Sequence, residues 1–335
     1  MRSSIARTVE AAVAWMPLWL LAVVWLTFAS LSPQFGRWKT AEQILEHSAS
    51  PAIVAVGITF VLLTAGIDLS VGAVMLVGGA VAGKMLLGGW SVPAAAAAML
   101  LVGGSWGLVN GILITRLKMI PFVVTLAMLF VGRGAGLWIT ETRAMNLPQG
   151  FRAVANADWL GVAVPVWMLA VSVGLSHLVL TRTPFGRQVY AMGNSLEGAR
   201  RAGVAVTRNQ VLVYGLCSLF AAVGGLITLS QLSAVSPTFG EGRELRAIAA
   251  AVLGGVSLFG GRGSAPGAAL GAVLVQTIEM GLVTLDADPN VSIRIGPYYY
   301  PLITSGVIFG AVLIDSLRRA WLHRRQRRRI RPATG

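Results

Sequence analysis

The chain has 335 residues, of which 55% are hydrophobic and only 12% are charged, and its mean hydropathy is +0.72. A soluble domain carries roughly twice this share of charged residues, so the composition excludes an ordinary soluble protein. The formal net charge of +14 does not indicate nucleic-acid binding either, because the basic residues lie at the ends of apolar runs and in the C-terminal tail. We therefore expect an all-α polytopic membrane protein, built as a bundle of helices.

Ten apolar segments are candidates for membrane-spanning helices, which need about 20 apolar residues each, and somewhat fewer where a helix is short or broken. The predicted spans are 12–31, 51–66, 69–88, 92–115, 120–139, 162–181, 210–232, 246–259, 264–283 and 298–317. Two of them, 51–66 and 246–259, are short. Together they predict a single transmembrane domain over 12–317, preceded by a short segment 1–11 and followed by a basic tail 318–335.

The distribution of basic residues predicts the orientation of this domain. Ten spans place both termini on the same side of the membrane, and cytoplasmic segments carry the excess of Lys and Arg. With the N-terminus inside, the inner segments hold eighteen basic residues and the outer segments hold seven. We therefore expect both termini in the cytoplasm, together with the polar loop 182–209.

A polar break interrupts the second apolar block at 66–70 (Gly-Ile-Asp-Leu-Ser). An aspartate at the bilayer centre costs on the order of 2.5–3.5 kcal/mol, so Asp68 should cap a helix or lie near water. One interpretation is a tight cytoplasmic hairpin, in which Asp68 and Ser70 cap the next helix and Gly66 closes the preceding one. The other is a broken helix whose end lines a transport path. A comparable break at 259–267 fits an inverted repeat.

The loop 182–209 is the longest polar interruption between two apolar blocks. Within it, Ser195 to Arg201 reads as one or two helical turns, which Ser195 could cap and Gly203 could end. A short basic helix between spans is a natural docking point for a soluble partner. The alternative is a loop that is basic only because cytoplasmic loops are.

Motifs of enzymes and nucleotide-binding proteins are not convincing in this chain. Gly78 and Lys84 have the spacing of a phosphate-binding loop, but the following residue is Met85 instead of Ser or Thr, and the run lies inside an apolar span. The three histidines are far apart in the sequence, and the single cysteine excludes a disulfide framework. We expect neither an enzyme nor a bound metal or cofactor.

Four ordered motifs carry a family resemblance. They are 66–72 (GIDLSVG), 121–126 (PFVVTL), 183–191 (TPFGRQVYA) and 247–255 (AIAAAVLGG). Together they resemble the permease subunit of bacterial ABC importers for monosaccharides, the ribose and galactofuranose group, over about residues 50–318. The related permeases for branched-chain amino acids share the general plan, and the 66–72 run points to the sugar branch.

The resemblance implies a set of partners in the bacterial inner membrane. Two permease subunits, identical or homologous, would form the path, and a periplasmic sugar-binding protein would deliver the monosaccharide. Two cytoplasmic ATP-binding subunits, or one double-domain ATPase, would bind ATP and Mg²⁺, so this chain needs no cofactor of its own. Transport would proceed by alternating access, with the loop 182–209 as the coupling segment that docks on the ATPase.

The resemblance also implies roles for individual residues. The coupling positions are Gly186, Asn194, Glu197, Ala199 and Gly203. Candidates for the path or broken helix are Asp68, Ser70, Thr125, Gly254 and Gly255. Candidates for docking the binding protein are Glu141, Arg143, Glu244 and Arg246, although the loop 140–161 could also be an ordinary solvated loop. Arg246 stands where the family commonly has aspartate.

Two other classes of membrane protein remain open. An ion-coupled secondary transporter needs acidic ligands in its spans, and only Asp68 and Glu279 are available. A scaffold or channel without energy coupling would make Glu197 and its loop dispensable.

Overall fold

In the computed structural model of the chain, residues 16–148, 150–152, 157–291, 294–307, 309–310 and 313 are described. The helices are α2 (Met16–Leu31), α3 (Trp38–Leu63), α4 (Val71–Leu87), α5 (Val92–Arg116), α6 (Pro121–Thr140), α8 (Val164–Arg182), α9 (Pro184–Asn194), α10 (Leu196–Arg201), α11 (Val206–Leu232), α12 (Arg243–Leu253), α13 (Ala265–Ala287) and the short 3₁₀ helix η1 (Pro297–Tyr299). The predicted segments 1–11 and 318–335 lie outside the described residues. The predominantly helical architecture is confirmed.

Two short antiparallel strand pairs complete the described structure. β1 (Met145–Asn146) pairs with β4 (Ala234–Val235), with Met145 opposite Val235. β2 (Asp158–Trp159) pairs with β3 (Val162–Ala163). The pairing of β1 with β4 fastens the loop after α6 to the end of α11.

Six described helices are long and apolar enough to cross a bilayer: α3, α5, α6, α8, α11 and α13. The apolar helices α2 and α4 are shorter. α12 has only 11 residues, about 16 Å at the helical rise, and so it cannot cross the bilayer by itself. The predicted span 298–317 continues as helix at residues 300–307 and then lies largely outside the described residues. The count of ten spans therefore stays a prediction.

The predicted span 51–66 has the wrong bounds. It is the second half of α3, which begins at Trp38 and has Pro51 inside it. The first half was missed because residues 39–50 are largely polar and give no hydropathy signal. Their burial is decided by neighbouring helices, and Ser48, Ala49 and Ser50 are all buried.

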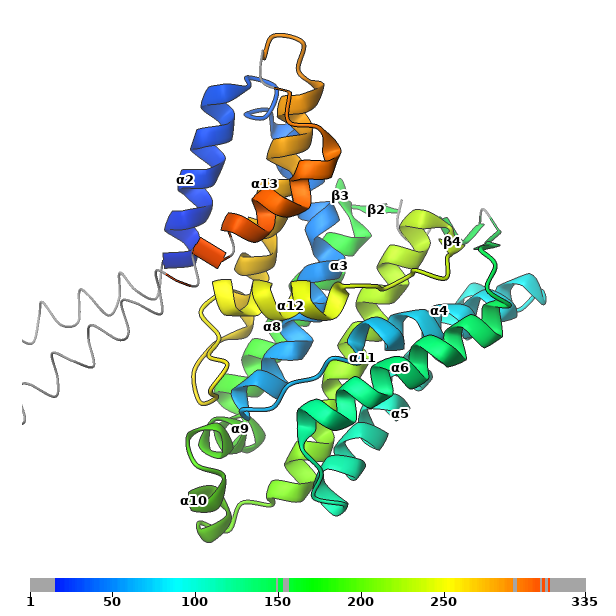
Figure 1. The fold of residues 1–335 in the computed structure, drawn as a ribbon, viewed down its shortest axis with the longest axis vertical. Coiled ribbons are helices and arrows are strands. Elements are labelled where there is room, and N and C mark those ends of the chain that lie inside the picture. The colour runs from blue at the N-terminus through cyan, green and yellow to red at the C-terminus, as the bar shows by residue number, and fades with distance from the viewer. Residues whose placement is uncertain are drawn as a thin grey trace, which may run out of the picture.

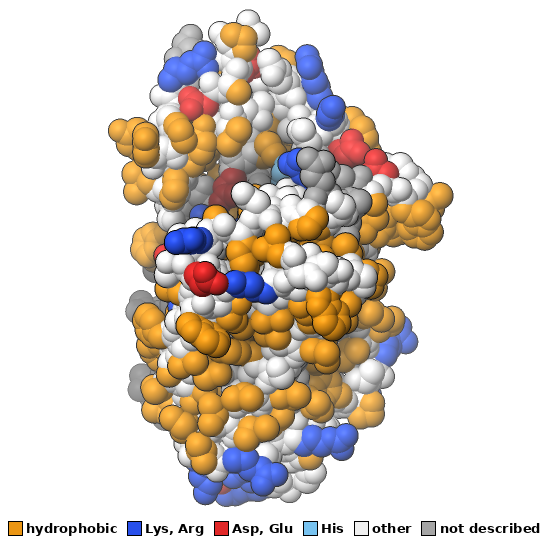
Figure 2. All heavy atoms as spheres, turned by 90° about the vertical axis from the view of Figure 1, so that its right-hand side faces the viewer, with side chains coloured by type: hydrophobic (Ala, Val, Ile, Leu, Met, Phe, Trp, Pro, Cys, Tyr) orange, Lys and Arg blue, Asp and Glu red, His pale blue; other side chains and the backbone are white. Residues whose placement is uncertain are grey.

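α3 and α11 form the core of the bundle. α3 packs against α8, α11, α12 and α13, and α11 also packs against α4 and α5. α4, α5 and α6 gather on one side of the molecule and α2 with α13 on the other, with α9 and α10 at the lower end (Figure 1). Apolar side chains cover much of the face drawn in Figure 2, as expected for a protein embedded in a membrane, and Lys and Arg lie at both ends and at several points between them.

A stripe of glycines on α5 sets its distance from α11. A Cβ built on Gly107 would overlap the carbonyl oxygen of Tyr214, and one on Gly103 would lie 2.8 Å from the carbonyl oxygen of Ser218. Gly111 meets the backbone of Val211 in the same way. Helices in lipid have no hydrophobic drive to associate, so this close backbone contact is what holds them together. The three glycines, at four-residue spacing, therefore form the face of α5 that packs on α11.

α12 is held against α13 by small residues and by one ion pair. Gly271 of α13 leaves no room for a Cβ beside the carbonyl oxygen of Ala250. Arg246 Nη1 lies 3.7 Å from Glu279 Oε1. The arginine that replaces the family's common aspartate therefore has an acidic partner on the neighbouring helix.

Replacing Gly107 by alanine should destabilise the bundle. Alanine favours an isolated helix by about 1 kcal/mol over glycine, but here its methyl group would force α5 away from α11 at a cost of about 1–3 kcal/mol. Gly104→Ala is the matched control, because a Cβ at Gly104 meets nothing within 4 Å. Thermal unfolding in detergent should show a lower Tm for Gly107→Ala and an unchanged or higher Tm for Gly104→Ala. Equal decreases in Tm for the two variants would contradict the role of Gly107 in packing α5 against α11.

Reversing the charge of Arg246 should also lower stability. Arg246→Asp would place a carboxylate beside Glu279, and a partly exposed pair of this kind contributes roughly 0.5–1 kcal/mol. The double variant Arg246→Asp with Glu279→Arg should recover most of the lost Tm. If the double variant is no more stable than Arg246→Asp alone, the ion pair does not hold α12 to α13.

Candidate functional site

The predicted coupling loop folds into two short helices, α9 and α10, between α8 and α11. α9 begins directly after α8, because the Thr183 hydroxyl accepts a hydrogen bond from the Gly186 N–H at 3.2 Å and Pro184 occupies the first helical position. A Cβ on Gly186 would overlap the last carbonyl groups of α8. Gly186 therefore makes the tight corner between the two helices.

The prediction for α10 is confirmed at both ends. The Ser195 hydroxyl accepts from the Gly198 N–H at 3.0 Å and caps the start. Gly203 has φ +80° and ends the helix, and the Val204 N–H donates back to the Ala199 carbonyl at 3.0 Å, as in a Schellman motif. Ala199 is buried with Met192 and Val206, so its small side chain fixes α10 against α9 and α11.

The charges of this loop are distributed unevenly. Glu197 forms an ion pair with Arg201 one turn further along α10, and both side chains are exposed. Beside it, a cavity of about 620 Å³ is lined by Arg116, Arg200 and Arg208, by Thr207 and by apolar residues. Within the described part of the chain, these three guanidinium groups have no ion-pair partner. The loop therefore presents a basic surface, and its one acid already has a partner.

The end of α9 packs against both breaks in the helices. A Cβ on Gly193 would overlap the carbonyl oxygen of Leu63, the last residue of α3. The same carbonyl accepts from the Gly261 N–H at 2.9 Å, and Gly261 lies in the loop after α12. Asn194 leaves no room for a Cβ on Gly261. Any movement of α9 must therefore move the end of α3 and the loop after α12.

A hydrogen bond fastens α9 to the second break. The Tyr190 hydroxyl donates to the Gly263 carbonyl at 2.8 Å. Sequence reasoning missed both Tyr190 and Gly193, although both lie in or beside the 183–191 motif. The residues that Tyr190 and Gly193 contact are distant in the sequence, so no local pattern predicts these contacts. Only the position of Gly193, one residue before the end of α9, could have indicated a close approach of another backbone.

The break after α3 holds a buried polar cluster. Asp68 is 0% exposed, and its Oδ1 accepts from the Ser70 N–H at 2.8 Å and the Ser70 hydroxyl at 2.7 Å. Asn110 of α5 donates to the Ser70 hydroxyl at 2.8 Å. Tyr214 and Cys217 of α11 lie beside Asp68. The break is thus held by side chains from three elements.

Two details of the predicted hairpin are wrong. Neither Asp68 nor Ser70 caps α4 with its side chain, because the Ser70 hydroxyl donates to Asp68 Oδ1 and accepts from Asn110. The left-handed residue that closes α3 is Ala65, with φ 59°, rather than Gly66. Gly66 is required for another reason, since a Cβ there would lie 2.6 Å from the Tyr214 hydroxyl.

The five candidate path residues fall into two groups. Thr125 is buried, and its hydroxyl lies 3.3 Å from the Ile67 carbonyl oxygen, so it joins Asp68 and Ser70 at the first break. Gly254 and Gly255 lie at the end of α12, where Gly255 has φ +89° and Gly254 packs on the backbone of α13. All three polar members are buried in this conformation.

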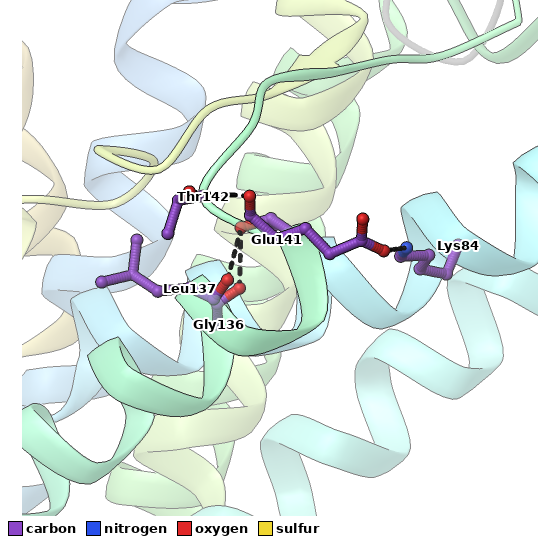
Figure 3. A network of polar contacts seen from close by, with 6 residues as sticks. Lys84, Gly136, Leu137, Glu141 and Thr142 are labelled. Atoms are coloured by element: carbon purple, nitrogen blue, oxygen red, sulfur yellow. Dashed lines mark hydrogen bonds and ion pairs between the residues drawn. The ribbon is translucent and has the colours of Figure 1, made fainter.

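The residues predicted to dock a binding protein differ in exposure. Glu141 accepts from Lys84 of α4 at 2.8 Å (Figure 3), and this contact lowers the pKa of the Glu141 carboxyl below its ordinary value. Glu141 and Arg143 are exposed, and Arg246 is about half exposed. Glu244 is only 8% exposed and its Oε2 has no hydrogen-bond partner. The docking role of all four stays a prediction.

Among the described residues, no group of three His, Cys, Asp or Glu side chains is placed to hold a metal ion. The first break gathers hydroxyl groups, the Asn110 amide, the Cys217 thiol and the Asp68 carboxyl, and most of these groups can form hydrogen bonds with a neutral polar molecule.

Comparison with known proteins identifies the family. A protein-family model described as the permease component of a branched-chain amino acid transport system matches residues 40–317. No solved structure matches the chain.

Curated relatives match along nearly their whole length. The ribose import permease protein of Escherichia coli strain K12 is 36% identical over 306 residues, which cover 89% of this chain and 90% of that protein. The ribose import permease protein of Bacillus subtilis strain 168 is 36% identical over 299 residues, with 88% and 90% covered. The autoinducer 2 import system permease protein of Salmonella typhi is 34% identical over 312 residues, with 92% and 88% covered. The chain therefore belongs to this family of multi-pass membrane permease components of transport systems.

Proposed function

We propose that the chain is the transmembrane permease subunit of an ATP-driven sugar importer in the bacterial inner membrane. It would form the path for a monosaccharide that a periplasmic binding protein delivers. The relatives named for ribose and autoinducer 2 import support this substrate class. The single structural observation that carries the proposal is the contact of α9 with both helix breaks, because it gives a cytoplasmic partner a mechanical route into the bundle.

The proposal assigns ATP and Mg²⁺ to partner chains. Two permease subunits would pair with two ATP-binding subunits or with one double-domain ATPase. In this chain the run from Gly78 to Lys84 is part of α4, so its backbone N–H groups are used within the helix and cannot cradle phosphates. Both termini and the α9–α10 segment would face the cytoplasm.

Coupling would follow the contacts of α9. Closure of the ATPase pair would push on α10 and the basic surface beside it. α9 would transmit the movement through Gly193 to the end of α3 and through Tyr190 to the loop after α12. The bundle would then change the side to which it opens.

The competing classes are less well supported. The curated relatives with the highest printed identities are named for ribose import, which favours a sugar over a branched-chain amino acid. An ion-coupled transporter needs acids that share a cation, but Asp68 is engaged with Ser70 and Glu279 with Arg246. These two acids have separate partners and form no common site.

The proposed function is tested by uptake of labelled monosaccharides into proteoliposomes that contain this chain, its ATPase and its binding protein. We expect uptake only when ATP is present on the ATPase side. Uptake without ATP, or without the ATPase, would contradict the proposal.

Tyr190→Phe should uncouple ATP hydrolysis from transport. The substitution removes the hydrogen bond to Gly263 and leaves the ring in place, so α9 would be joined to the second break less rigidly. We expect ATP hydrolysis to continue while the sugar transported per ATP falls several-fold. Tyr298→Phe is the control, since Tyr298 is 93% exposed. An unchanged ratio in Tyr190→Phe would remove this contact from the coupling route.

The basic surface should bind the ATPase by charge. Arg200→Glu and Arg208→Glu each add a like charge opposite an acidic partner surface, and each should weaken association of the purified subunits by about tenfold at low salt. The loss of affinity should become smaller as the ionic strength rises. Arg143→Glu, in the loop after α6, is the control and should have no effect. If all three variants bind the ATPase as tightly as the wild type does, these arginines do not contact the ATPase.

A further inference from the structure

Two charged side chains from different helices approach the same position inside the bundle. Arg133 lies on α6, well inside a helix that is long and apolar enough to span the membrane, and Glu244 lies in the first turn of α12. Glu244 is 8% exposed, and Arg133 is partly buried. Ionisable side chains at such depth are costly and commonly mark the route of a transported substrate.

The point where they meet is the first turn of α4. A Cβ built on Gly72 would lie 3.3 Å from Nη2 of Arg133 and would overlap both Oε2 of Glu244 and the carbonyl oxygen of Gly240. Because Gly72 has no side chain, both atoms can face the same small space. Gly72 follows directly on the buried break that holds Asp68 and Ser70.

Each of the two groups keeps an unused hydrogen-bonding atom. Arg133 donates through Nη1 to the Phe239 carbonyl at 2.9 Å, but its Nη2 is buried without a partner. Glu244 Oε2 is likewise buried without a partner. The two side chains form no direct ion pair among the described residues. A buried hydrogen-bonding atom without a partner is unfavourable, and more so when it carries a charge.

A hydroxyl group supplies what both atoms lack. It can donate its hydrogen to Oε2 of Glu244 and accept from Nη2 of Arg133 through a lone pair. The pair of side chains has no net charge, so it favours a neutral ligand over an anion or a cation. An aromatic ring adjoins the site: Trp106 of α5 lies 2.9 Å from the Cβ position of Gly132, beside Arg133, and its indole N–H is buried without a partner.

We propose that Arg133 and Glu244 bind a hydroxyl group of the transported sugar inside the path, beside Gly72. The inference rests on the proposed transport function. The atoms are covered in this conformation, so the sugar reaches them only when α4, α6 and α12 move apart, as alternating access requires. Glu244 then acts inside the path, unlike Arg246 on the same helix, which is partly exposed.

The test compares uptake of D-ribose with uptake of its monodeoxy analogues in the reconstituted transporter, or of the best-transported monosaccharide with its own analogues. In the wild type, one analogue should be transported less well than the parent sugar. Glu244→Gln keeps the shape of the side chain and removes its charge, and it should reduce the preference for that hydroxyl about tenfold. Arg133→Lys should reduce the same preference. The binding protein contributes equally to wild type and variants, so its selectivity cancels in the comparison.

Glu241→Gln is the matched control, because Glu241 is exposed on the segment just before α12, and it should leave the preference unchanged. If Glu244→Gln lowers the uptake of every analogue by the same factor, the pair is only structural and the inference is overturned. If Glu244→Gln leaves the relative uptake of the parent sugar and its analogues unchanged, the inference is overturned as well, while the proposed function stands. If the wild type transports no monosaccharide with ATP, the proposed function fails first.

Discussion

Three segments that are distant in the sequence meet at the carbonyl oxygen of Leu63. Leu63 is the last residue of α3, so its carbonyl has no partner within the helix. The Gly261 N–H supplies that partner at 2.9 Å, and Gly193 lies against the same oxygen without room for a side chain. The end of α3, the end of α9 and the loop after α12 can keep their positions only together.

This constraint explains why glycines gather at the contacts of α9. Gly193, Gly260 and Gly261 meet backbone atoms or the side chain of Asn194 at distances that no Cβ could tolerate. Gly260 and Gly261 also have positive φ values. The same principle operates along α5, where three glycines let its backbone touch α11. In a membrane, close backbone contact and buried hydrogen bonds replace the hydrophobic effect as the forces that order helices.

The local features of the candidate site could be predicted from the sequence. Ser195 caps α10 and Gly203 ends it, because both interactions involve residues a few positions apart. The cap expected from Asp68 and Ser70 does not form, because the Ser70 hydroxyl donates to Asp68 and accepts from Asn110 of α5. The start of α3 was missed for a related reason: its first half is polar, and only packing against other helices buries it.

The sequence by itself determined that the chain is a multi-pass membrane permease, which transport family it resembles, and where the short helix α10 begins and ends. These conclusions depend on composition, on the order of motifs and on contacts between near neighbours. Only the tertiary structure decided that α9 touches both breaks, that Glu279 faces Arg246, and that Arg133 and Glu244 meet over Gly72. Such contacts join residues from separate helices, and their geometry follows from how closely the helix backbones approach, which no local pattern encodes.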